Sequence, residues 1–164
     1  MKEENMDRDW EYDVQLMSRR LATLYYHMVN AMLEELPEEQ TERIVNKAVE
    51  GYGHYWGEYC KEKVLASNLP LTPNHYDLGG DLPSRGLSVG CDLISNDCEL
   101  RQEYRECLFA RVWKELGFER WGRLYCYVDY AKFAAYNPDL SVEHEKNELD
   151  GDNCCILHVT APKH

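Results

Sequence analysis

The chain has 164 residues, of which 44% are hydrophobic and 12% aromatic, which is enough for one domain over residues 1–164 with one packed core. The formal charge of −12 would repel a phosphate backbone or an anionic membrane surface, so neither nucleic acid nor a membrane is an expected partner. No apolar run approaches the roughly 20 residues of a membrane span, and the polar, acidic start is not expected to act as a signal peptide. The seven cysteines include no CxxC pair, so we expect reduced thiols in a cytoplasmic protein.

Two long helices are predicted for the first part of the chain. Residues 1–8 are mostly charged and expected to be frayed. Apolar residues then recur with helical spacing from Trp10 to Leu36, and a second helix begins in the acidic turn after Pro37. This second helix is interrupted by three glycines, Gly51, Gly53 and Gly57. They indicate close helix packing or a ligand near the backbone, or equally a kinked or early helix end.

Four residues are candidates for binding a substrate. His54 and Tyr52 lie among the glycines and aromatic residues of the second helix. His75 lies in residues 67–90, a connection rich in proline and glycine whose length is typical of a lid or a binding loop. Phe133 belongs to the last predicted helix. The alternative is that the two histidines are packing residues or are simply solvated.

The second half of the chain alternates between short strands and helices. Strand candidates flank Asn96-Asp97, and Tyr104–Phe109 alternates so that Cys107 and Phe109 face the core. The other predicted elements are a helix over Ala110–Leu116, a helix over Phe118–Tyr136, and a hairpin of Val142–Leu149 and Cys154–Thr160 around Asp150-Gly151. This order predicts an α+β fold, with N-terminal long helices packed on a small, mainly antiparallel sheet and a further covering helix.

Cysteine and aspartate positions in the last third of the chain suggest a catalytic pocket. Cys126 and Asp129 are three positions apart and would share one helical face. In the last strand, alternation places Cys155 on the inner face and Cys154 with His158 on the outer face. If that strand packs against the helix, the thiols and the carboxylate meet. The expected catalytic pocket contains four residues: Cys107, Cys126, Asp129 and Cys155.

The chemistry of such a pocket depends on the thiol pKa. A thiolate is a strong nucleophile, and Cys126 is the first choice because a carboxylate shares its face. An acidic neighbour raises a thiol pKa, however, so Asp129 fits better as a general base on water or in orienting a protonated ring nitrogen. The alternative is that the thiols are small, buried packing residues. Without a glycine-rich phosphate cradle after a strand or an HExxH element, we expect no organic cofactor and no metal.

Several short motifs occur in a recognisable order. They are Cys107-Leu108-Phe109-Ala110, Leu116-Gly117, Cys126-x-x-Asp129, Asn137-Pro138 and Gly151-Asp152-x-x-Cys155. In this order they resemble the L-2-amino-thiazoline-4-carboxylic acid hydrolase family. The resemblance implies a cytoplasmic hydrolase of a small-molecule substrate, in which water opens a thiazoline ring at the carbon bonded to nitrogen and sulfur. The departures are the strand Ile156-Leu157-His158 and the additional Cys154.

Two other classes of function remain as alternatives. The ending of the chain is more distantly similar to the vinyl-reductase four domain, a small-ligand or metal-binding module whose fold resembles that of vesicle-tethering subunits. In that case Cys107, Cys126 and Cys155, with Asp129 or a histidine, would hold zinc without catalysis. A scaffold subunit with no chemistry is the third reading, and a homo-oligomer is compatible with each of them.

Overall fold

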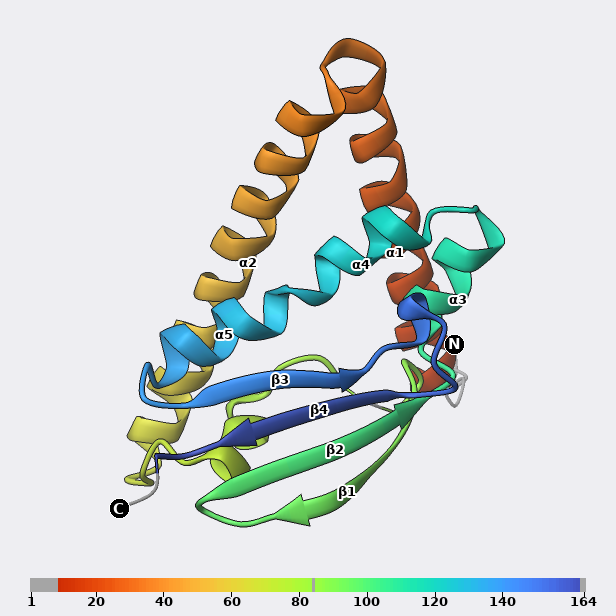
Figure 1. The fold of residues 1–164 in the computed structure, drawn as a ribbon. Coiled ribbons are helices and arrows are strands. Elements are labelled where there is room, and N and C mark those ends of the chain that lie inside the picture. Colours follow the sequence, from red (N-terminus) through yellow and green to blue (C-terminus); the bar gives the residue numbers. More distant parts are fainter. Residues whose placement is uncertain (1–8, 84, 163–164) are drawn as a thin grey trace, which may run out of the picture.

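The computed structural model describes residues 9–83 and 85–162 (Figure 1); the charged residues 1–8, expected to be frayed, lie outside the described residues. Two long helices, α1 (Trp10–Glu35) and α2 (Glu38–Ala66), open the chain as predicted. The Asp9 side chain caps α1 by accepting hydrogen bonds from the first-turn N–H groups of Glu11 and Tyr12. In Figure 1 the two helices form the arms of an inverted V. None of the described helices is long and apolar enough to cross a membrane.

A four-stranded antiparallel sheet follows, in the order β1-β2-β4-β3. Its strands are β1 (Val89–Ser95), β2 (Glu99–Arg105), β3 (Ser141–Lys146) and β4 (Cys155–Thr160). The predicted turn between β1 and β2 forms because the Asn96 side chain accepts the N–H groups of Cys98 and Glu99. The α+β fold and the mainly antiparallel sheet are therefore confirmed.

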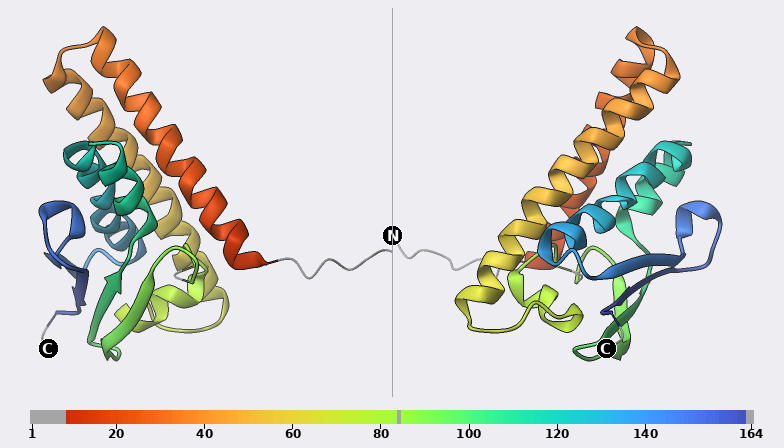
Figure 2. Two further views of the ribbon diagram at one scale, coloured as in Figure 1. Left: turned by 90° about the vertical axis from the view of Figure 1, so that its right-hand side faces the viewer. Right: turned by 60° about the vertical axis from the view of Figure 1, so that its left-hand side comes forward.

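Short helices fill the space between the long helices and the sheet, as Figure 2 shows. They are α3 (Leu108–Glu115), α4 (Glu119–Cys126) and α5 (Val128–Tyr136). One apolar cluster surrounds Trp113 and joins α1 and α2 to α3 and α4. A second cluster surrounds Tyr136 and joins α2 and α5 to the inner face of β2 and β4. Residues of α5 are thereby held against the sheet, whereas α3 and α4 pack against the long helices.

Three predicted elements need correction. The strand over Tyr104–Phe109 ends at Arg105, because Glu106 adopts a left-handed φ of 56° and Cys107 instead precedes α3. The helix over Phe118–Tyr136 is two helices that break at Tyr127. The strand predicted to reach Leu149 ends at Lys146, and a 3₁₀ turn over Glu148–Asp150 follows it. The loop of residues 67–90 also contains a 3₁₀ helix, Pro73–Gly79.

The glycines of α2 do not end the helix; two of them allow α5 to pack closely. A Cβ on Gly57 would lie 2.8 Å from the Cβ of Ala135 and would meet the Lys132 carbonyl. A Cβ on Gly53 would lie 2.6 Å from the Cβ of Ala131. At Gly51, a Cβ would meet nothing within 4 Å. Close helix packing is thus the reason for Gly53 and Gly57 alone.

This difference predicts opposite effects of two alanine substitutions on stability. Gly57→Ala should lower the free energy of unfolding by about 1–3 kcal/mol, because backbone atoms of α5 must move. Gly51→Ala should raise it by about 0.5–1 kcal/mol, because alanine favours the helix. Urea denaturation of the two variants measures both changes, and equal effects at the two positions would contradict the packing.

Candidate active site

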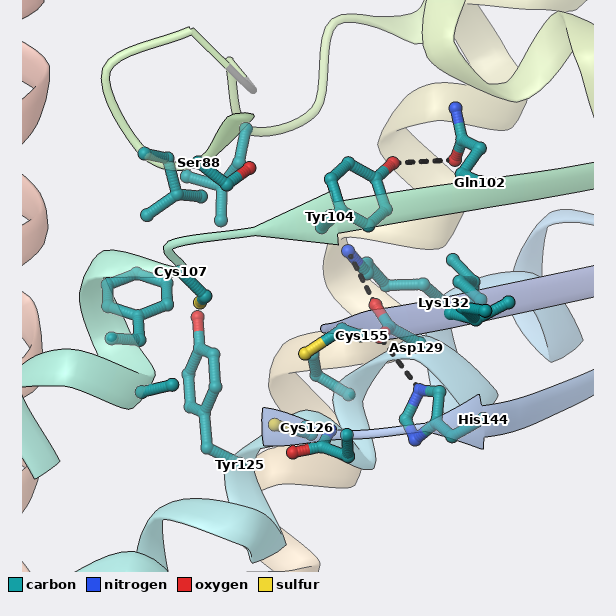
Figure 3. Close-up of a pocket in the computed structure, with 18 of the residues that line it drawn as sticks. Ser88, Gln102, Tyr104, Cys107, Tyr125, Cys126, Asp129, Lys132, His144 and Cys155 are labelled. Carbon is teal, nitrogen blue, oxygen red and sulfur yellow. Dashed lines mark hydrogen bonds and ion pairs between the residues drawn. The ribbon is translucent and has the colours of Figure 1, made fainter. Parts of the chain in front are cut away.

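A cavity of about 200 Å³ lies between the short helices and the inner face of the sheet (Figure 3). Its wall is built from α2, α3, α4, α5, the inner ends of three strands and the loop before β1. The apolar part comes from aromatic and aliphatic side chains, among them Phe109, Trp113 and Leu149. The polar part comes mainly from α5, β3 and the loop. A small ligand with one polar and one apolar side would suit this wall.

The structure brings six of the eight predicted site residues to this cavity: Tyr52, Cys107, Cys126, Asp129, Phe133 and Cys155. The two histidines do not line it. His54 lies on the exposed face of α2, and the Nδ1 atom of His75 is held 2.9 Å from both the Thr72 hydroxyl and the Pro70 carbonyl. The loop contributes Tyr76, Asp81 and Leu87 to the wall instead, and its role as a lid stays a prediction.

An ion-pair group forms the polar wall. The Lys132 ammonium lies 2.7 Å from an Asp81 oxygen and 3.1 Å from an Asp129 oxygen. The side chains of Lys132, Asp81 and Asp129 are only 12%, 13% and 24% exposed. Burial alone would raise the Asp129 pKa, but the Lys132 ammonium and the His144 ring N–H outweigh it and hold that pKa at about 2. Burial would lower the Lys132 pKa, and the two carboxylates raise it. Asp129 and Lys132 are therefore both charged at neutral pH.

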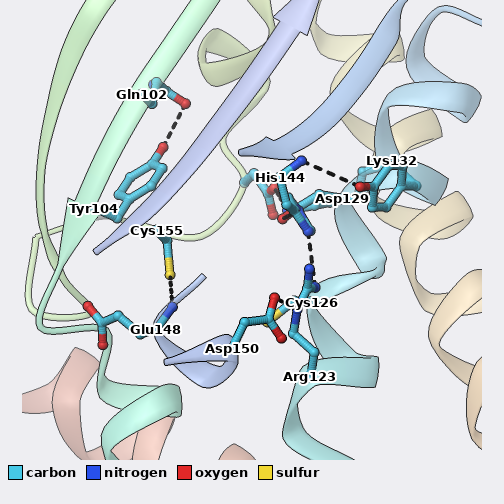
Figure 4. A network of polar contacts seen from close by, with 12 residues as sticks. Gln102, Tyr104, Arg123, Cys126, Asp129, Lys132, His144, Glu148, Asp150 and Cys155 are labelled. Carbon is cyan, nitrogen blue, oxygen red and sulfur yellow. Dashed lines mark hydrogen bonds and ion pairs between the residues drawn. The ribbon is translucent and has the colours of Figure 1, made fainter. Parts of the chain in front are cut away.

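His144 connects this group to α4 (Figure 4). Its Nε2 lies 3.0 Å from Asp129 Oδ2, and its Nδ1 lies 3.1 Å from Arg123 Nη1. Because a guanidinium only donates, Nδ1 accepts and the ring proton resides on Nε2, which donates to Asp129. Arg123 also pairs with Asp150 at 2.8 Å. The imidazole is thus fixed in one tautomer and holds the Asp129 carboxylate in place.

The three cavity thiols are protonated. Burial raises the pKa of Cys126 and of Cys155 to about 12 and also raises the pKa of Cys107. Cys155 Sγ accepts the Glu148 N–H at 3.4 Å, and Cys126 Sγ lies 3.9 Å from the Gly122 carbonyl. A thiol with such a pKa is a poor nucleophile at neutral pH. The cavity therefore offers thiols as weak donors and polarisable wall atoms.

Cys154 lies apart from the cavity, as the alternation predicted. Cys154 precedes β4 and is buried, with 2% exposure, although it does not line the cavity. His158 does face the outer side of the sheet, where its ring nitrogens lie 2.8 Å from Glu99 and 3.0 Å from Glu145. Cys154 is therefore buried without lining the cavity that Cys155 lines.

Exposure and the raised thiol pKa values together predict the order in which the cysteines are alkylated. At neutral pH, iodoacetamide should modify the exposed Cys91 and Cys98 first, while Cys126 and Cys155 react slowly and speed up as the pH rises toward about 12. Peptide mass mapping over time at several pH values measures these rates. Cys126 modified as fast as Cys98 at pH 7 would show that burial does not suppress its thiolate.

Sequence reasoning missed Lys132, Asp81 and His144. Lys132 is three positions after Asp129 and so lies on the same face of α5, a spacing that was visible in the sequence. Asp81 and His144 reach the site from a loop and from a strand, and no local pattern marks them. In the described ranges, no group of three or more His, Cys, Asp or Glu side chains is arranged to hold a metal ion.

Comparison with known proteins agrees with this fold. The chain matches the family model of L-2-amino-thiazoline-4-carboxylic acid hydrolase over residues 16–159. The crystal structure of trafficking protein particle complex subunit 3 from Naegleria fowleri, covalently bound to palmitic acid, is similar with a TM-score of 0.51 and 16% sequence identity, covering 91% of this chain and 97% of that one. At this identity the likeness shows the fold alone. No curated protein matches the chain. Because the family match spans most of the sequence, the chain belongs to the L-2-amino-thiazoline-4-carboxylic acid hydrolase family.

Proposed function

We propose that this protein hydrolyses a small heterocyclic amidine at a carbon–nitrogen bond, with an amino-thiazoline carboxylic acid as the model substrate. The observation that carries the proposal is the buried group of Asp129, Lys132 and Asp81 in the wall of a cavity otherwise rich in aromatic rings and thiols. The family name supports a hydrolase of this type.

The charge of this group favours a cationic ligand. Two carboxylates lie against one ammonium in a largely buried group, so the carboxylates outnumber the cation there. A protonated 2-amino-thiazoline is a delocalised amidinium cation with two N–H groups on one edge. Charge-assisted hydrogen bonds from those groups to a carboxylate are stronger than neutral ones. Asp129 is therefore assigned to binding and orienting the amidine.

Water is the proposed nucleophile. The raised pKa values of Cys126 and Cys155, about 12 each, leave few thiolates at neutral pH. They favour water over the thiolate, the two nucleophiles that the sequence left open. Asp129 is too weak a base, because its pKa is about 2. Asp77 also lines the cavity, burial raises its pKa, and it accepts the Gln102 amide N–H at 3.0 Å. It is the carboxylate best suited to take a proton from water.

The bonds and atoms balance with water alone. The water oxygen bonds to the carbon between the ring nitrogen and sulfur, and the electron pair of the C=N bond moves to nitrogen. The ring carbon–nitrogen bond then breaks, a C=O bond forms, and both protons of the water end on the released nitrogen. No oxidant or reductant takes part in these steps.

The direct test incubates the purified full chain with L-2-amino-thiazoline-4-carboxylate. Mass spectrometry should show a product heavier by one water, and the reaction in heavy-oxygen water should label that product without a covalent adduct on the protein. A persistent adduct on Cys126 would contradict water attack. Tight binding without any product would contradict catalysis and support the alternative of a small-ligand-binding module.

A further inference from the structure

A buried hydroxyl of the cavity wall makes no hydrogen bond within the part of the chain that the structure describes. Two buried side-chain oxygens make no hydrogen bond to the described residues, Thr41 Oγ1 and Tyr125 Oη. Of these, Tyr125 lines the cavity, and only 9% of the residue is exposed. In Figure 3 its side chain extends from α4 with the hydroxyl directed toward Cys107. The neighbouring Tyr52 hydroxyl adds to the raised pKa of Tyr125 but does not meet hydrogen-bond geometry.

The surroundings of this hydroxyl are apolar and rigid. The Tyr125 ring contacts the rings of Tyr25, Phe109 and Trp113, with centroids 5.7, 5.4 and 5.4 Å away. Such packing holds the ring in place. A buried hydroxyl without a hydrogen bond destabilises the free protein, so its retention here needs a reason. The cavity supplies one, because a ligand can bring the missing partner.

The missing partner is an acceptor, and it is uncharged. Burial raises the Tyr125 pKa, so the phenol keeps its proton and donates. The Asp129 and Asp81 carboxylates lie close enough to contribute to the raised Tyr125 pKa. Two carboxylates near the hydroxyl would repel an anionic ligand group. A neutral oxygen of the ligand is therefore the partner that fits.

We propose that the Tyr125 hydroxyl donates a hydrogen bond to the oxygen that hydrolysis places on the attacked carbon. This assignment rests on the proposed function, since an amidine carries no oxygen on that carbon until water adds. The hydrogen bond forms only as the new carbon–oxygen bond forms, so it lowers the barrier without strengthening substrate binding. Tyr125 is then a catalytic residue of the cavity that Asp129 also lines.

The test compares Tyr125→Phe with Tyr25→Phe. The Tyr25 hydroxyl lies in the same ring cluster but already donates to the Trp121 carbonyl at 2.8 Å. Tyr125→Phe should leave the melting temperature unchanged or raised and lower kcat by about 10²-fold with little change in KM. Tyr25→Phe should lower the melting temperature and leave kcat unchanged. A melting temperature that falls in Tyr125→Phe would show that the hydroxyl has a partner in the free protein and would overturn the assignment.

A matched pair of ligands separates this inference from the proposed function. 2-Oxothiazolidine-4-carboxylate carries an oxygen on the carbon in question, whereas L-2-amino-thiazoline-4-carboxylate carries nitrogen there. Tyr125→Phe should bind the oxo compound about tenfold more weakly than the wild type does and bind the amino compound equally well. Unchanged affinity for both, with turnover by the wild type, would overturn the Tyr125 assignment alone. If the wild type neither binds nor converts these compounds, the proposed function is wrong and the assignment falls with it.

Discussion

Lys132→Met is expected to lower the free energy of unfolding by about 3–5 kcal/mol at pH 7. The substitution keeps the length of an apolar side chain but removes the ammonium that lies 2.7 Å from Asp81 and 3.1 Å from Asp129. Two largely buried carboxylates would then face one another without a cation between them. Urea denaturation of the wild type and the variant measures the difference.

The size of this effect should depend on pH in a defined direction. The Asp129 pKa is about 2 in the folded chain against an ordinary value of 3.8, so its pairing stabilises the fold above about pH 4. That contribution is lost as the pH falls through about 2. In Lys132→Met the buried carboxylates can take up protons in mild acid. The difference in free energy of unfolding between the wild type and the variant should therefore become smaller there. A difference in free energy of unfolding that grows on acidification would contradict this linkage.

A second lysine provides the control. Lys61 pairs with Glu58 at 3.2 Å, but the side chains are 31% and 54% exposed. Lys61→Met should therefore lower the free energy of unfolding by less than about 1 kcal/mol. If Lys132→Met lowers the free energy of unfolding no more than Lys61→Met does, the buried ion-pair group contributes little to stability. That result would contradict its role in holding the polar wall of the cavity together.

The elements that the sequence predicted are those with local signals. The two long helices follow from regular apolar spacing, and the turn between β1 and β2 follows from Asn96. The break at Tyr127 has no such signal, because no proline or glycine lies at that position. The left-handed Glu106 is equally unmarked. Both irregularities depend on how α3, α4 and α5 fit over the sheet, which only the assembled fold decides.

In the candidate site, too, local spacing predicted some features, whereas others depend on tertiary contacts. Cys126, Asp129 and Cys155 were predictable because helix and strand periodicity place them on inner faces. Their protonation could not be read from the sequence, since it depends on burial and on partners such as Lys132 and His144. The pair of Lys132 and Asp81 joins residues 51 positions apart. Spacing thus indicated which side chains meet, whereas the charges at the site arise from tertiary contacts.

Asp129→Asn is expected to reduce kcat/KM for L-2-amino-thiazoline-4-carboxylate by about 10²- to 10³-fold, because the amide lacks the charge that binds the amidinium edge. Cys126→Ser should retain activity within about tenfold, because a thiol with a pKa of about 12 is not the attacking group. Steady-state kinetics at pH 7 on folded variants gives both values. Asp150→Asn is the control, since Asp150 pairs with Arg123 but is 49% exposed and does not line the cavity. Loss of activity in Cys126→Ser alone would mean that the thiol attacks the substrate, and that Asp129 only supports the fold through Lys132 and His144.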